Sequence, residues 1–130
     1  MSNANASRVV DISSKYKAGQ RVFNNITLIE SQFFALDLPD VVFNEIYFER
    51  VTFYMSSLAR STFSDSTIIN CRFHLTSLEN TCFQNSTIKN SGFISSSLNT
   101  SQFYKTELTG IRFGYLHNPP FKTLFLDLPP

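Results

Sequence analysis

Large apolar residues recur at every fifth position along most of this chain. The series begins at Phe23 and ends at Phe113, and each of its nineteen members is Phe, Leu or Ile. Five residues turn a helical side chain about 140° past a full turn, and an odd step along a strand crosses to the opposite face. Neither element keeps such a series on one side. We therefore expect the chain to turn a corner every five residues and to wind into a coil.

The interior of that coil receives two residues from each group of five. From Ser31 onward, the residue two places before each central residue is Ser, Thr, Cys, Val, Ile or Leu. Such side chains suit a second inward position. Buried hydroxyls there would need hydrogen-bond partners, which backbone groups at the corners can supply.

The alternation of residue types indicates how many corners make one coil. Phe alternates with Leu or Ile at nearly every step, so the chemical period is ten residues. A coil of fifteen would stack Phe on Leu, whereas a coil of twenty stacks like on like and keeps the volume of each layer nearly constant. We therefore predict four sides. Two opposite columns consist of phenylalanines, namely Phe23, Phe43, Phe63, Phe83 and Phe103 on one side and Phe33, Phe53, Phe73, Phe93 and Phe113 on the other.

These nineteen consecutive five-residue repeats resemble the pentapeptide-repeat family. The resemblance covers residues 21–115 and rests on the central Phe, Leu or Ile of each repeat. It implies an all-β fold, a right-handed quadrilateral parallel β-helix of just under five coils. The position before the centre is mostly Thr, Ser, Gln or Arg where the family commonly has Asp or Asn. This chain is thus similar to a degenerate, Phe-rich variant of the family.

Two segments flank the predicted β-helix. Residues 1–20 are expected to cap the first coil, with Val9, Val10, Ile12 and Tyr16 packed against it and Gly19 ending a short helical turn. Residues 116–130 do not repeat. We expect this apolar tail to form a lid or, as in some family members that bind DNA gyrase, a dimerisation element. Its apolar residues are Phe121, Leu124, Phe125, Leu126 and Leu128.

Charge and composition argue against several functional classes. The chain has 11 basic and 10 acidic residues, scattered along its length. A nucleic-acid binder normally has a basic patch, so no nucleic acid is expected as a partner. No apolar run reaches the ~20 residues of a membrane span, and the polar opening residues do not resemble a secretory signal. We expect a cytoplasmic protein, with a secreted effector delivered to a host cell as the alternative.

No residue set has the pattern of a catalytic or metal site. His74 should face solvent, His117 lies in the tail, and no Cys or carboxylate has metal-ligand spacing to either. Cys71 occupies an inward position whereas Cys82 points outward, too far away to form a disulfide. The chain has no Gly-rich phosphate loop. We therefore predict a protein that is not an enzyme and that uses no cofactor and no metal.

The outward residues distinguish one side of the coil. After each central Phe of the Phe33 column, the next two residues are largely apolar or aromatic, whereas those after the Phe23 column are mostly polar. A contiguous apolar patch usually marks a contact surface, and Tyr, Phe and Met are enriched at interfaces. Arg72 and Arg112 would rim this patch. We predict an interaction face consisting of Phe34, Tyr54, Met55, His74, Leu75, Ile94 and Tyr115.

Three functions remain open at this point. The first is a module that presents this face to a partner protein or to a second copy as a homodimer, unless the N-terminal segment or the tail folds over it. The second is implied by the family resemblance, namely a DNA mimic that binds a topoisomerase such as gyrase, although the acidic surface this requires is missing. The third is a repeat domain of a secreted bacterial effector, which the resemblance also implies.

Overall fold

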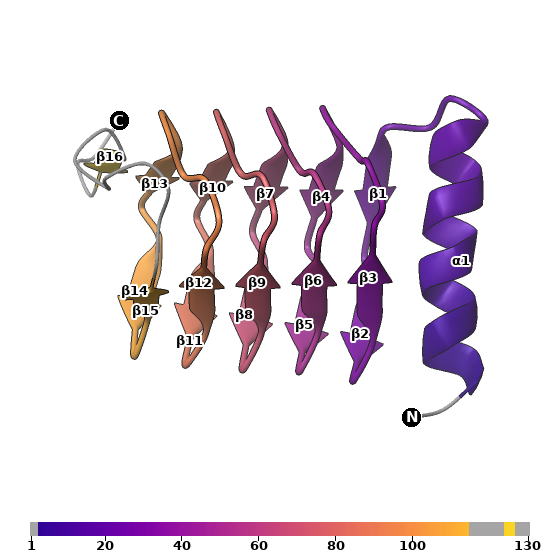
Figure 1. Ribbon diagram of the computed structural model, residues 1–130, viewed down its shortest axis with the longest axis horizontal. Coiled ribbons are helices and arrows are strands. Elements are labelled where there is room, and N and C mark those ends of the chain that lie inside the picture. Colours follow the sequence, from indigo (N-terminus) through magenta and orange to yellow (C-terminus); the bar gives the residue numbers. More distant parts are fainter. Residues whose placement is uncertain (1–2, 115–123, 127–130) are drawn as a thin grey trace.

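In the computed structural model the chain forms a solenoid of stacked coils with a helix at its N-terminal end (Figure 1). The structure describes residues 3–114 and 124–126. Sheet A contains β1 (Val22–Asn24), β4 (Val42–Asn44), β7 (Thr62–Ser64), β10 (Cys82–Gln84), β13 (Gln102–Tyr104) and β16 (Leu124–Leu126). Sheet B contains β2 (Thr27–Ile29), β5 (Tyr47–Glu49), β8 (Thr67–Ile69), β11 (Thr87–Lys89) and β14 (Glu107–Thr109). Sheet C contains β3 (Gln32–Phe34), β6 (Thr52–Tyr54), β9 (Arg72–His74), β12 (Gly92–Ile94) and β15 (Arg112–Gly114).

The strands pair in parallel with a register that stacks each repeat on its equivalent in the next coil. Phe23 pairs with Phe43 in sheet A, and Phe33 pairs with Phe53 in sheet C. The fourth side has single parallel bridges in place of strands, and these join Asp37, Ser57, Ser77 and Ser97. The predicted fold class, an all-β parallel β-helix with four sides and about five coils, is confirmed.

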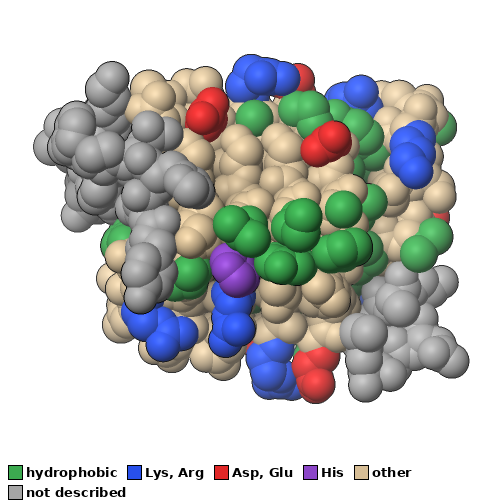
Figure 2. Space-filling model, in the orientation of Figure 1, with side chains coloured by type: hydrophobic (Ala, Val, Ile, Leu, Met, Phe, Trp, Pro, Cys, Tyr) green, Lys and Arg blue, Asp and Glu red, His purple; other side chains and the backbone are tan. Residues whose placement is uncertain are grey.

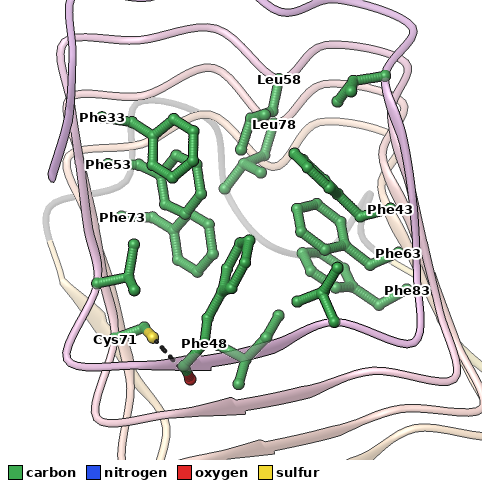
Figure 3. Close-up of a cluster of buried hydrophobic side chains, with 14 of the residues drawn as sticks. Phe33, Phe43, Phe48, Phe53, Leu58, Phe63, Cys71, Phe73, Leu78 and Phe83 are labelled. Atoms are coloured by element: carbon green, nitrogen blue, oxygen red, sulfur yellow. Dashed lines mark hydrogen bonds between the residues drawn. The ribbon is translucent and has the colours of Figure 1, made fainter. Parts of the chain in front are cut away.

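The interior consists of columns of like side chains (Figure 3). In the column on sheet C, the ring centroids of Phe33 and Phe53 lie 4.4 Å apart, and those of Phe53 and Phe73 lie 5.0 Å apart. Phe48 replaces an aliphatic residue on sheet B. Its ring lies 5.7 Å from that of Phe43 on sheet A, edge to face, and 6.1 Å from that of Phe53 on sheet C. Phe48 therefore contacts both phenylalanine columns. Aromatic pairs in these geometries stabilise a core beyond the area they bury.

Each corner places one residue in the left-handed backbone region. Every fifth residue from Asn25 to Gly110 has a φ between 48° and 65°. Asn, Asp and Gly tolerate this region best, yet several corners carry other residues, such as Glu45 and Met55. The sequence predicted a corner at every fifth residue but not its backbone conformation, because these positions share no residue type.

The second inward positions from Val41 to Ser101 are buried as predicted, whereas Ile26, Leu36, Thr106 and Ile111, nearer the two ends, are only partly buried. The buried hydroxyls have hydrogen-bond partners. The Ser66 hydroxyl donates to the Ser64 carbonyl at 2.8 Å and accepts the Ile46 amide at 3.2 Å. In the described part of the chain, no buried side-chain nitrogen or oxygen lacks a hydrogen bond. Several of these hydroxyls, including those of Ser66 and Thr76, therefore tie a corner to the coil before it.

The N-terminal helix α1 (Asn3–Lys17) lies against the first coil (Figure 1). Val9 and Ile12 are buried there, and the Tyr16 hydroxyl donates to the Pro39 carbonyl at 2.6 Å. The expectation of a short helical turn is wrong, because the helix has 15 residues. Val10 does not pack as expected either, since it points away from the coil and is 64% exposed. Among the described residues, no helix is both long enough and apolar enough to cross a bilayer.

The C-terminal end of the solenoid differs from its middle. Strand β16 extends sheet A beyond β13, whereas sheets B and C end at β14 and β15 within the described residues. Phe113 is consequently 38% exposed although it occupies an inward position of the repeat. Of the predicted tail, Phe121 and Leu128 lie outside the described residues, as do the side chains of Leu124, Phe125 and Leu126.

Candidate interaction face

The third residue of each strand in sheet C forms a row along the solenoid. Strand pairing places Phe34 beside Tyr54, Tyr54 beside His74, and His74 beside Ile94. The ring centroids of Phe34 and Tyr54 are 5.8 Å apart, and those of Tyr54 and His74 are 5.1 Å apart. The row ends at Gly114, above which the Ile94 side chain lies so closely that a Cβ there would meet it at 3.1 Å. Four of the seven predicted face residues are thus adjacent.

A second row lies at the corner that follows sheet C. Its members are Ala35, Met55, Leu75 and Ser95. The other three corner series carry polar side chains or glycine throughout their described positions, as with Asp65 after sheet A. Apolar residues at a left-handed corner are therefore confined to this side of the molecule.

These two rows form the face, which is open to solvent (Figure 2). Figure 2 shows hydrophobic side chains gathered in the middle of the view, over the strands of sheet C. Phe34, Met55 and Leu75 are three of the six large apolar residues that are exposed in the described part of the chain. Phe34 is 56% exposed, so helix α1 does not cover it. Tyr115, the seventh predicted face residue, lies outside the described residues.

Buried hydroxyls hold the backbone beneath the face. The Thr76 hydroxyl donates toward the carbonyls of His74 at 3.0 Å and Phe53 at 3.1 Å, and it accepts the Ser56 amide at 3.4 Å. Ser56 does the same one coil earlier, toward Tyr54 and Phe33. These bonds fix the carbonyl ends of the face strands to neighbouring coils, so the face is a rigid surface.

The two flanks of the face carry opposite charges. Arg72 is exposed on the sheet C side and forms no ion pair with a described residue. On the other side, a shallow hollow of about 220 Å³ lies beside Leu75 and is bordered by Ser77, Ser95 and Glu79. The sequence pattern predicted the arginine rim but did not indicate this hollow.

Comparison with solved structures identifies the fold. The structure is similar to HetL, a pentapeptide repeat protein involved in heterocyst differentiation regulation in Nostoc sp. strain PCC 7120, with a TM-score of 0.51 and 17% identity. The match covers 78% of this chain and 45% of HetL, so the chain spans less than half of that protein. This chain has the pentapeptide-repeat fold.

Two further solved structures show weaker likeness to this chain. Rfr23, a pentapeptide repeat protein from Cyanothece 51142, has a TM-score of 0.43 and 12% identity over 89% of this chain and 99% of its own. QnrB1, a plasmid-mediated fluoroquinolone resistance protein, has a TM-score of 0.38 and 11% identity over 80% of this chain and 78% of its own. No family model matches the sequence, and no curated protein matches it.

The reactive side chains in the described part of the chain do not converge. His74 lies in the face row against Tyr54, whereas the Cys71 thiol points inward toward the Phe48 carbonyl, 3.4 Å away (Figure 3). Burial raises the pKa of Cys71 to about 11, and it also raises the pKa of Cys82. Both thiols are free. Within the described residues, no group of three His, Cys, Asp or Glu side chains is placed to hold a metal ion.

Proposed function

We propose that this chain is a non-enzymatic protein-interaction module. Its rigid β-helix presents the face built on Phe34, Tyr54, His74 and Ile94, with Met55 and Leu75 beside them, to a partner protein or to a second copy. The observation that carries this proposal is the apolar corner row, because the other three corner series carry only polar residues or glycine in the described part of the chain. Exposed apolar side chains in a contiguous patch are typical of contact surfaces.

The rigidity of the face supports this function. Side chains that project from a stacked sheet, above hydroxyls that fix its carbonyls, lose little conformational freedom when a partner binds. Tyr54 and Phe34 also belong to the residue types that are enriched at interfaces. A surface that is already ordered converts more of its contact energy into affinity.

The charge distribution favours this function over imitation of DNA. In the described part of the chain, Glu30 pairs with Arg50 at 3.0 Å, and Asp40 pairs with Arg60 at 2.9 Å, each from one coil to the next. Carboxylates neutralised in this way do not form the continuous negative surface that a protein resembling DNA requires.

The test compares two lysine pairs on opposite sides of the same solenoid. The double variant Tyr54→Lys with Leu75→Lys places two charges on the face. The matched control, Gln84→Lys with Asn85→Lys, adds the same charge at a third strand position and a corner on sheet A. For both variants, sedimentation measures the mass in solution, and chemical cross-linking in extracts of the source cells detects a bound partner. Circular dichroism checks that both variants are folded.

We expect the face variant to lose self-association or its cross-linked partner, because desolvating the buried lysine charges is unfavourable. The control should retain both. If both variants keep the wild-type mass and the wild-type cross-links, the face is not an interface and the proposal fails.

A further inference from the structure

We infer that the occupant of this face is a single amphipathic α-helix of another protein, lying along the solenoid axis. Its apolar stripe rests on Tyr54 and Leu75, an acidic side chain on one flank meets Arg72, and a lysine on the other flank meets Glu79. This inference rests on the proposed function and specifies the partner that it leaves open. Size, spacing and charge support it separately.

The size of the face fits one helix better than a second copy of the chain. The row from Phe34 to Ile94 spans four successive coils, and its three coil-to-coil steps of about 4.8 Å give a length of roughly 15 Å. A helix about 10 Å wide covers that length in about three turns. A stable dimer buries about 800 Å² on each partner, far more than a strip of these dimensions provides.

The spacing along the row also matches a helix. Neighbouring rings lie 5.8 Å and 5.1 Å apart. A helix presents its apolar side chains once per turn, about every 5.4 Å. This differs from the coil repeat of about 4.8 Å by only about 0.6 Å per coil, so successive turns stay close to successive coils over this length. An extended strand repeats side chains on one face at about 6.8 Å and loses register within two coils. The face therefore favours helical over extended ligands.

The flanks indicate how the helix is rotated about its own axis. Arg72 is exposed and unpaired among the described residues, in contrast to Arg50 and Arg60, which are paired with Glu30 and Asp40. On the opposite flank Glu79 is exposed and accepts a hydrogen bond from the Ser97 hydroxyl at 3.1 Å. Positive charge on one flank and negative charge on the other favour a helix that carries acidic side chains toward Arg72 and basic side chains toward Glu79.

The hollow beside Leu75 suits a lysine in particular. Its volume is about 220 Å³, and it lies between Leu75, the hydroxyls of Ser95 and Ser97, and the carboxylate of Glu79. A lysine side chain can lay its aliphatic stem against Leu75 while its ammonium group reaches the carboxylate at the rim.

The experiment uses synthetic peptides of about 14 residues, long enough for three to four turns, and the full ¹⁵N-labelled chain. Two peptides share one composition of Leu, Glu, Lys and Ala. The first orders them as a helix with a leucine stripe flanked by Glu on one side and Lys on the other. The second alternates apolar and polar residues as a strand. Chemical-shift titration measures the affinity and the site of each.

We expect the helical peptide to shift the amide signals of β6 and β9 and to bind about tenfold more tightly than the alternating peptide. Arg72→Glu or Glu79→Lys alone should weaken binding about fivefold. Both together should restore it, because the helix can then bind in the reverse direction. Lys89→Glu on sheet B is the matched control and should change nothing.

Three results would overturn the inference. They are equal or tighter binding of the alternating peptide, failure of the helical peptide to shift the signals of the face, and a wild-type chain that dimerises through this face by the lysine-pair test. The first and third leave the proposed function standing. In the second case, the lysine-pair test decides separately whether the face binds any protein.

Discussion

At the residue scale, the corners show what the five-residue period does and does not determine. Inward positions were predictable because a corner at each fifth residue leaves two side chains per side inside, and Phe53 and Thr76 are buried accordingly. The left-handed conformation of the corner residue was not predictable, because Glu45, Met55 and Asn70 share it without sharing a side-chain type. The register of the solenoid imposes this conformation.

The corner at Glu45 provides a test of this strain. Glu45 has a φ of 53°, and its backbone N–H donates to the Ser64 carbonyl at 2.8 Å. Its side chain forms no ion pair with a described residue. We expect Glu45→Asn to stabilise the protein by up to about 1 kcal/mol, because Asn tolerates this region. Glu45→Val, which is β-branched, should destabilise it by at least as much. Urea unfolding of the two variants measures both effects, and equal stability would show that the corner is not strained.

Cys71 predicts a loss of stability at alkaline pH. Burial raises the pKa of its thiol to about 11, above the ordinary value of 9.0. Because the unfolded chain loses this proton first, stability is complete below pH 9 and falls as the pH rises toward 11, by at most about 3 kcal/mol. Cys71→Ser keeps a small hydrogen-bonding group without that ionisation. The variant should therefore lose less stability than wild type between pH 7 and pH 10.5 in urea unfolding, and parallel losses would refute this.

At the element scale, the strands are held by what lies beneath them as well as by their pairing. The Thr76 hydroxyl makes three hydrogen bonds, to the His74 carbonyl of β9, to the Phe53 carbonyl of β6 and to the Ser56 amide in the coil before it. Thr76→Val keeps the shape but leaves the buried Ser56 amide and two carbonyls with fewer partners, so we expect a loss of about 1–3 kcal/mol. Thr52→Val, on the outer surface of β6, is the control and should change little. Thermal unfolding compares the two, and a fully stable Thr76→Val protein would contradict this role.

Ion pairs between coils predict the behaviour of the solenoid in acid. The hydrogen bond from Arg60 lowers the pKa of Asp40 below its ordinary value of 3.8. The unfolded chain therefore takes up the proton more readily, and the stabilisation is present above pH 3.8 and is lost as the pH falls below it. The Tm difference between wild type and Arg60→Gln should be positive at pH 6 and should approach zero at pH 2.5. A difference that persists in acid would assign the effect to packing of the arginine stem.

The N-terminal helix was the element that sequence reasoning described least well. In residues 3–17 few apolar residues mark a buried stripe, and Val9 and Val10 are adjacent although only Val9 is buried. The first coil selects which of them packs. This information lies in tertiary contact and not in the local pattern.

At the scale of the whole molecule, the four sides follow one five-residue repeat but differ in their outer surface, and only three of them carry strands. The apolar face was predictable from residues 34–35, 54–55, 74–75 and 94–95, because strict periodicity assigns each residue to a side. The hollow beside Leu75 was not, because it depends on the depth left between neighbouring coils. The function of the apolar face as an interface stays a proposal, and it concerns one of the four sides.

Under the proposed function, one side of the solenoid contacts a partner and the others do not. The most direct measurement places a benzophenone cross-linker at each corner of a single coil. Four single-site variants replace Asp65, Asn70, Leu75 or Asn80 with cysteine in a Cys82→Ser background. All four positions are exposed and have φ between 52° and 58°. Buried Cys71 should not react.

After irradiation in extracts of the source cells, cross-linked products are quantified by mass spectrometry. We expect the label at position 75 to form a defined cross-link to another protein chain, while the labels at 65, 70 and 80 give only background. Equal cross-linking from all four corners, or a defined product from position 65 on the opposite side, would contradict this expectation.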